Sequence, residues 1–154
     1  MENTATLPDL TSDDAKVAEM QMGANWFYWA AILAAASSLV YHFTGFASHL
    51  VGLGIAQYVD ANAAASGVES QRWAALLVNL GFAGLLAGFG YFARKGSDLA
   101  FIVGMFLYFF DSVVLLGYRE FFPFGFHLFV LFFIAKGLLA SRRRYDPSVD
   151  ATGA

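Results

Sequence analysis

The chain has 154 residues, of which 58% are hydrophobic and only 14% are charged. An ordinary soluble domain carries about 25% charged residues, so this composition excludes a disordered chain and a nucleic-acid-binding protein. The lack of cysteine excludes disulfides, thiolate metal sites and a cysteine nucleophile. With a mean hydropathy of +0.57, the sequence predicts a small polytopic membrane protein whose main partner is the lipid bilayer.

The composition divides the chain into three parts. Residues 1–24 form an acidic, polar tail with five carboxylates and one lysine, which lacks the basic start and apolar core of a secretory signal. Residues 25–141 hold the apolar segments and are expected to form the transmembrane helical domain. Residues 142–154 begin with three arginines and continue as a polar tail that we expect to be flexible.

Four apolar segments are long enough for spanning helices, since a bilayer core of ~30 Å needs about 20 residues of helix. They are residues Trp26–Phe43, Trp73–Ala93, Leu99–Tyr118 and Phe121–Ala140. The first is slightly short, but it begins with an aromatic cluster typical of the membrane interface. We therefore predict an all-α polytopic membrane bundle with four transmembrane helices.

A fifth helical segment, residues 46–66, has an unusual number of polar side chains for a spanning helix. It is poor in Leu, Ile and Phe, and its polar residues include His49, Gln57 and Asp60. Two arrangements fit this pattern: a full crossing, or a re-entrant helix held by the other segments. The choice decides which side of the membrane holds the N-terminus.

The basic residues predict the orientation. Arg94 and Lys95 follow the apolar segment Trp73–Ala93, and Arg142, Arg143 and Arg144 follow the last segment, two crossings later. Because cytoplasmic loops are enriched in Lys and Arg, we expect both clusters on the cytoplasmic side of a bacterial inner membrane, with the C-terminus cytoplasmic. The 67–72 loop and the 118–121 turn are then expected on the opposite side.

Small residues recur at helical spacing in two segments. They are Ala30, Ala34 and Ser38 in the segment Trp26–Phe43, and Gly81, Gly84 and Gly88 in the segment Trp73–Ala93. Such columns allow helices in lipid to approach closely. We expect both columns to pack inside one bundle; the alternative is self-association into a homo-oligomer or assembly into a larger membrane complex.

Polar residues inside the apolar segments are the candidate functional positions, because an ionisable side chain in lipid is costly unless it is paired. Asp111 lies eight residues before Arg119 and His127 lies eight residues after it. In an antiparallel hairpin that turns at Arg119 and Glu120, both side chains sit roughly 12 Å from the turn. We therefore expect them to be at one depth and to meet if both face the seam.

The same arithmetic applies to Asp60 and Asn79, which are symmetric about the 67–72 loop. The resulting hypothesis is one intramembrane polar layer of Asp60, Asn79, Asp111 and His127, supported by Gln57, Tyr108 and His49. A structural network, a proton, cation or small-ligand site, and a catalytic metal site all fit such a layer. We favour the structural network and assign no catalytic residue.

No cofactor is predicted. The many aromatic residues of the last two segments suit a flat cofactor with His127 as a ligand to haem or a metal, or beside a quinone, but they equally suit lipid-facing packing, which we favour. No nucleotide loop follows from Gly52 and Gly54, because they do not follow a soluble strand.

The stretches GLGIAQYVD (Gly52–Asp60) and GMFLYFFD, followed by GFH (Gly104–His127), resemble elements of a family of small uncharacterised bacterial multi-helix integral membrane proteins. The resemblance implies a membrane protein and no specific activity. Three functions thus stand side by side: a non-enzymatic accessory or structural membrane component, a proton, cation or small-ligand binding or transport protein, and an intramembrane metal- or cofactor-dependent enzyme. We favour the first, and so a non-enzymatic role.

Overall fold

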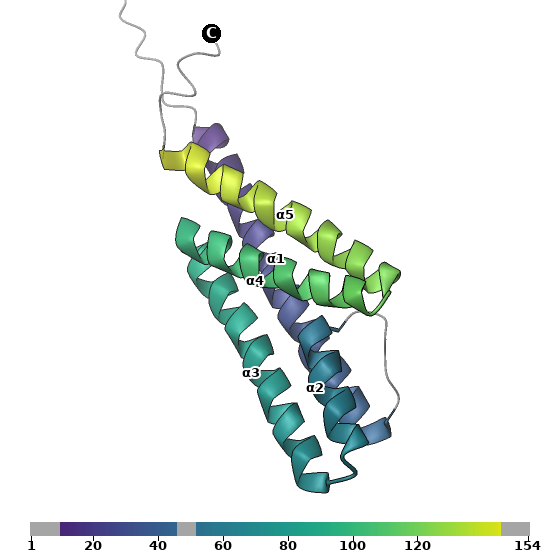
Figure 1. Cartoon of the computed structure of the whole chain (residues 1–154). Coiled ribbons are helices and arrows are strands. Elements are labelled where there is room, and N and C mark those ends of the chain that lie inside the picture. Colours follow the sequence, from purple (N-terminus) through teal and green to yellow (C-terminus); the bar gives the residue numbers. More distant parts are fainter. Residues whose placement is uncertain (1–9, 46–51, 146–154) are drawn as a thin grey trace, which may run out of the picture.

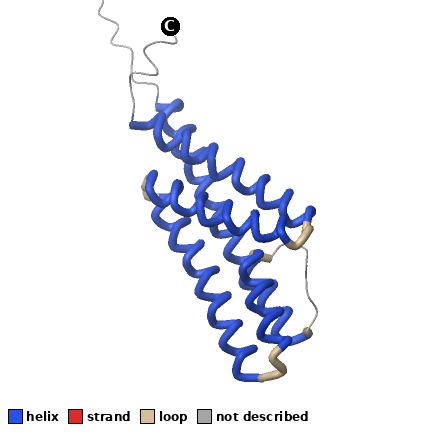
Figure 2. The backbone as a smooth tube through the Cα atoms, in the orientation of Figure 1, coloured by secondary structure: helices blue, strands red, loops and turns tan. Residues whose placement is uncertain are grey.

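The computed structural model describes residues 10–45 and 52–145, which form α-helices and no strand (Figures 1 and 2). The helices are α1 (Leu10–Thr44), α2 (Gly54–Ala65), α3 (Glu69–Arg94), α4 (Asp98–Gly117) and α5 (Phe121–Tyr145). By length and hydropathy, α1, α3, α4 and α5 could each cross a membrane. The predicted all-α bundle with four such helices is confirmed.

The short helix α2 is re-entrant within the bundle. The guanidinium of Arg72, at the start of α3, donates a hydrogen bond to the carbonyl oxygen of His42, at the end of α1, over 2.8 Å. The chain therefore leaves α1 and returns through α2 to the same end of the bundle, as Figure 1 shows. Of the two arrangements left open for residues 46–66, the full crossing is excluded; residues 46–51 lie outside the described part of the chain.

Ion pairs hold the other end of the bundle together. Lys136 of α5 lies 3.3 Å from Glu19 of α1. Asp98, at the start of α4, accepts a hydrogen bond of 2.7 Å from the hydroxyl of Ser141 and lies 3.6 Å from Arg142. The start of α1, the α3–α4 turn and the end of α5 thus share one end of the bundle.

Helix α1 begins earlier than the sequence boundaries imply. The expected polar tail of residues 1–24 is helical from Leu10 onward, because Ala, Glu, Lys and Met favour helix and because this part packs against α5. Met20 and Ala24 are buried, with 2% and 0% of their surface exposed. The helical bundle therefore includes residues of the acidic stretch 1–24.

Helices α1 and α5 cross at a pair of glycines. A Cβ atom added to Gly23 would lie 2.5 Å from the Cα of Gly137, so the two backbones are in direct contact. Further along α1, the ring of Phe27 fills the space beside Gly104 of α4, where an added Cβ would meet ring carbons at 2.6 Å. Small residues thus set the distance between helices in this bundle, as expected in lipid.

Only one of the two predicted small-residue columns packs inside the bundle. Ala30, Ala34 and Ser38 on α1 are each at most 4% exposed. The other column is not packed: Cβ atoms added to Gly81, Gly84 and Gly88 would have no neighbour within 4 Å, which corrects that expectation. Helix α3 instead buries an adjacent face, which contains Ala75, Leu76, Asn79, Ala83, Leu86, Gly90 and Ala93.

Replacing Gly23 with alanine should destabilise the protein. The added methyl group would overlap the backbone of α5, and overpacking of this kind costs about 1–3 kcal/mol of unfolding free energy. Thermal denaturation in detergent would measure the change. Gly84→Ala is the matched control, since the space beside Gly84 is open; equal losses in both variants would contradict this account of the α1–α5 crossing.

Candidate functional site

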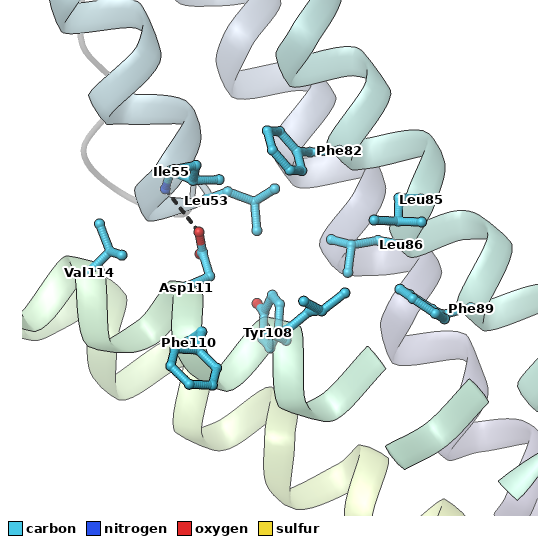
Figure 3. Close-up of a pocket in the computed structure, with 11 residues that line it drawn as sticks. Leu53, Ile55, Phe82, Leu85, Leu86, Phe89, Tyr108, Phe110, Asp111 and Val114 are labelled. Carbon is cyan, nitrogen blue, oxygen red and sulfur yellow. Dashed lines mark hydrogen bonds between the residues drawn. The ribbon is translucent and has the colours of Figure 1, made fainter. Parts of the chain in front are cut away.

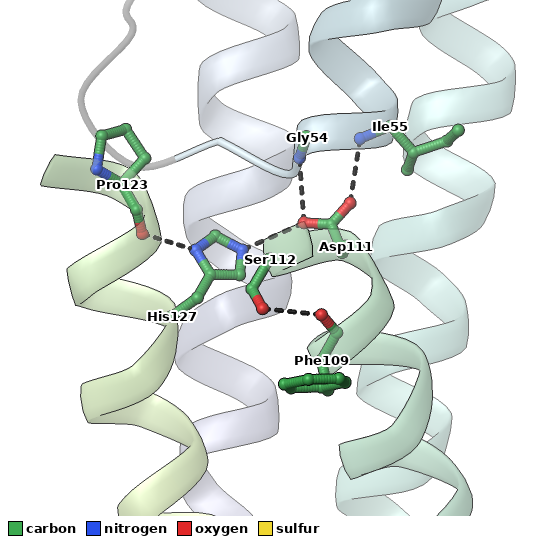
Figure 4. Close-up of polar contacts among 7 residues, drawn as sticks. All are labelled: Gly54, Ile55, Phe109, Asp111, Ser112, Pro123 and His127. Carbon is green, nitrogen blue, oxygen red and sulfur yellow. Dashed lines mark hydrogen bonds and ion pairs between the residues drawn. The ribbon is translucent and has the colours of Figure 1, made fainter. Parts of the chain in front are cut away.

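Asp111 of α4 and His127 of α5 meet inside the bundle (Figure 4). The Nε2 atom of His127 lies 3.0 Å from Oδ2 of Asp111, and the two residues are 1% and 7% exposed. The turn between the helices is short, with Arg119 in the left-handed region at φ 61°. The structure therefore brings together the two residues that the spacing about this turn placed at one depth.

The hydrogen bonds fix how many protons the pair carries. Nδ1 of His127 lies 2.9 Å from the carbonyl oxygen of Pro123, which can only accept, so Nδ1 carries a proton and donates it. One further proton must lie between Nε2 of His127 and Oδ2 of Asp111. Whether the pair is an imidazolium and a carboxylate or a neutral imidazole and a carboxylic acid, its net charge is zero.

Asp111 also caps the buried start of α2. Its Oδ2 accepts a hydrogen bond from the backbone N–H of Gly54, and its Oδ1 accepts one from Ile55, both over 2.9 Å. The residue at the cap position of α2, Leu53, has no side-chain acceptor to offer. A carboxylate from another helix therefore takes two of the free N–H groups at this helix start and interacts favourably with its dipole.

This contact was not foreseen from the sequence, although Gly54 carried a signal of it. A Cβ atom at Gly54 would lie 2.9 Å from the backbone oxygen of Asp111 and 3.0 Å from Leu115. Only glycine lets the start of α2 approach α4 closely enough for both hydrogen bonds to form. Gly54 thus reflects a close backbone approach and not a nucleotide loop.

Tyr108 supports the pair from α4. Its ring is stacked on the imidazole of His127, with 4.3 Å between ring centroids and 14° between ring planes. The tyrosine is 3% exposed. Ser112, beside Asp111, donates its hydroxyl to the carbonyl oxygen of Phe109 over 2.6 Å and takes no part in the pair.

The other members of the predicted polar layer lie away from this pair, Asp60 on α2 and Asn79 on α3. Asp60 is six residues beyond Gly54, roughly 9 Å along the helix, and lines a small cavity with His42 and Arg72. Asn79 is 1% exposed and donates to the carbonyl oxygen of Ala56 over 3.4 Å. Among the described residues, neither Asp60 nor Asn79 hydrogen-bonds to Asp111 or His127.

Two buried polar atoms in this region have no partner within the described part of the chain. They are Oδ1 of Asn79 and Nε2 of Gln57. Gln57 therefore lies near the start of α2 without joining the Asp111 and His127 network. His49, the remaining supporting residue, lies outside the described residues.

A cavity of about 310 Å³ adjoins the pair between α2, α3 and α4 (Figure 3). Its walls are apolar except for Tyr108 and Asp111. The residues that line it are Leu53, Ile55, Phe82, Leu85, Leu86, Phe89, Leu107, Tyr108, Phe110, Asp111 and Val114. His127 lies behind this wall, so Asp111 is the member of the pair that reaches the cavity.

The imidazole of His127 is poorly placed to bind haem or a metal. Both of its ring nitrogens are already engaged, one by Pro123 and one by Asp111. A metal at Nε2 would have to displace the carboxylate that caps α2. Within residues 10–45 and 52–145, no group of three His, Cys, Asp or Glu side chains is arranged to hold a metal ion.

Comparison of the chain with protein-family models, curated proteins and solved structures found no significant match. The resemblance noted in the sequence therefore brings neither a family nor a function, and the function has to be argued from the site itself.

Removing Asp111 should destabilise the protein through two partners at once. Asp111→Ala leaves the imidazole of His127 and the start of α2 without an acceptor, and breaking one side of a buried pair costs about 3 kcal/mol. Urea or detergent denaturation would measure this loss. Asp13→Ala, at a carboxylate whose side chain is 72% exposed, is the control and should cost less than about 1 kcal/mol.

A double-mutant cycle separates the pair from the general cost of each change. Asp111→Ala combined with His127→Ala should cost less than the sum of the two single changes, with a coupling of about 0.5–3 kcal/mol. Additive losses would show that the two side chains do not interact in the folded protein.

Proposed function

We propose that the protein is a non-enzymatic membrane component that binds a lipid-soluble molecule in the cavity between α2, α3 and α4. The cavity is the observation that carries this proposal. At about 310 Å³ it falls in the size range of small-molecule sites, and nine of its eleven lining residues are apolar. A few polar groups at one wall of an apolar cavity are typical of sites that orient a small ligand.

The position of the cavity supports access from the bilayer. Its lining residues Leu85, Leu107 and Phe110 are 47%, 41% and 52% exposed, so the cavity reaches the outer surface of α3 and α4. Both helices are long and apolar enough to cross a membrane. A molecule dissolved in the lipid could therefore reach the cavity without passing through water.

The engagement of the reactive groups favours binding over catalysis. Asp111 holds the start of α2, His127 donates to Pro123, and the hydroxyl of Ser112 donates to a backbone carbonyl. These three side chains near the cavity, each able to serve as an acid, a base or a nucleophile, already have a structural partner, and the hydroxyl of Tyr108 is the exception in the lining. The engaged groups support a structural role for the polar pair and leave the cavity as the functional feature.

The charge of the pair argues against the alternative of a cation site. Because one proton lies between Asp111 and His127 in either form, the pair offers no net negative charge to the cavity. A bound cation would have to displace that proton from a network that is 1–7% exposed. A neutral ligand meets no such cost.

We further propose that the protein lies in a bacterial inner membrane, and we assign each end of the bundle to one side of that membrane. Arg94 and Lys95 lie at the same end as Arg142, which pairs with Asp98 at the start of α4. The positive-inside rule then favours the cytoplasm for this end, together with the start of α1 and the C-terminus. The α2–α3 turn is expected on the opposite side.

Filling the cavity should abolish saturable binding. An aryl diazirine, a small apolar photoprobe, is expected to label the Leu107–Val114 stretch of the native protein in lipid nanodiscs, and excess naphthalene should compete with it. Leu107→Trp places an indole over the cavity. It should reduce the part of the labelling that naphthalene can compete with about tenfold, which corresponds to about 1.4 kcal/mol of binding free energy. Leu116→Trp, at an exposed α4 position that does not line the cavity, is the control.

Labelling that naphthalene does not compete, or that is equal in Leu107→Trp and Leu116→Trp, would contradict the proposed binding site. Such labelling would mean that the probe reports only the lipid-facing surface of α4.

The topology can be tested with single cysteines, because the chain has none of its own. In intact bacterial cells, an impermeant thiol reagent should label Ser70→Cys at the start of α3. It should label Asp13→Cys, in the first turn of α1, only after the membrane is permeabilised. The reverse pattern would contradict the proposed orientation.

A further inference from the structure

We infer that the ligand of this cavity is a neutral molecule that carries a hydroxyl group on an apolar ring system. This inference rests on the proposed binding function and adds the chemical class of the ligand. It is carried by the two polar groups of the cavity wall, Asp111 and Tyr108, and by the shape of the rest of the wall.

Asp111 has one free acceptor position. A carboxylate has about four lone-pair positions, two on each oxygen. On Oδ2, one faces the N–H of Gly54 and the other faces Nε2 of His127, while on Oδ1 one faces the N–H of Ile55. The second position of Oδ1 remains, and it remains whichever atom of the pair holds the shared proton.

Tyr108 adds a group that can both donate and accept. It lies three residues before Asp111, so the two side chains share a face of α4. Figure 3 shows both pointing from α4 toward α2 and α3. Stacking on the imidazole of His127 fixes the ring of Tyr108, and its hydroxyl has no hydrogen-bond partner among the described residues.

A ligand hydroxyl complements these two groups. It can donate to Oδ1 of Asp111 and accept from the hydroxyl of Tyr108 at the same time. An ether or a carbonyl can only accept, and so would leave the Asp111 position unfilled. A carboxylate or phosphate would find no cationic side chain to pair with, since the described lining contains no Lys, Arg or His.

The apolar walls indicate the body of the ligand. Phe82, Phe89 and Phe110 contribute aromatic rings to the lining, and aromatic rings pack favourably on one another at offset or edge-on geometry. An apolar cavity of about 150 Å³ holds benzene, so about 310 Å³ has room for a fused two-ring compound. 2-Naphthol is therefore a suitable probe.

Calorimetric titration of the full-length protein in lipid nanodiscs tests the inference, with empty nanodiscs subtracted. The three probes are 2-naphthol, 2-methoxynaphthalene and naphthalene, which share the ring system and differ in the hydroxyl. We expect 2-naphthol to bind about fivefold or more tightly than 2-methoxynaphthalene, the effect of one or two hydrogen bonds.

Tyr108→Phe is the decisive variant, because it removes only the hydroxyl and keeps the ring beside His127. It should weaken 2-naphthol about fivefold and leave the naphthalene affinity unchanged. Tyr91→Phe, at a half-exposed tyrosine of α3 outside the cavity lining, should change neither. Asp111 itself is unsuitable for this test, because its removal also uncaps α2.

The outcomes separate the two proposals. If all three probes bind saturably, Leu107→Trp blocks them, and neither the hydroxyl of the probe nor that of Tyr108 affects affinity, the ligand class is overturned while the binding cavity stands. If no probe binds saturably in any variant, the proposed function fails, and the inferred ligand class fails with it.

Discussion

The structure depends on one carboxylate that caps a helix inside a membrane protein. Helix α2 begins within the bundle and not at its end, so its first N–H groups need an acceptor from another part of the protein. Each backbone donor left unpaired in such a place would cost several kcal/mol. Asp111 accepts from Gly54 and Ile55, and the proton that it shares with His127 leaves the buried pair with no net charge.

The re-entrant helix and the cavity follow from this cap. With its start held at α4, α2 occupies only half of the bundle and places Leu53 and Ile55 over the space between α3 and α4. The same carboxylate forms the polar wall of that space. A helix that begins at mid-bundle thus creates a site with one polar end and apolar walls, which is an arrangement suited to an oriented, lipid-soluble ligand. Half-helices in other membrane proteins likewise direct their starts toward binding sites.

Much of this arrangement could be predicted from the sequence, and the failures have physical causes. The four long helices follow from the length of the apolar segments. Asp111 and His127 are predicted to lie at one depth because both are eight residues from the same tight turn. Asp60 and Asn79 could share a layer with Asp111 and His127 only if the turns of the two hairpins were level along the bundle. They are not level, because the α4–α5 turn lies beside the start of α2, whereas the α2–α3 turn lies at its other end.

The buried face of α3 and the contact between Asp111 and Gly54 could not be predicted from the periodicity of the sequence. Spacing could not show which face of α3 meets its neighbours, so the column of Gly81, Gly84 and Gly88 was assigned to the bundle when it faces outward. The contact of Asp111 with Gly54 joins residues 57 positions apart in the chain. The lack of a side chain at Gly54 indicates a close approach at this position, but it does not show which helix approaches.

Hydrogen exchange at the backbone N–H groups of Gly54 and Ile55 tests the central claim most directly. In the native protein in lipid nanodiscs, both N–H groups should exchange slowly, like those in the middle of α3. In Asp111→Ala their protection should fall while that of α3 is kept. Exchange in the native protein as fast as at the exposed turn residue Gly67, or protection that persists without the Asp111 carboxylate, would contradict the account.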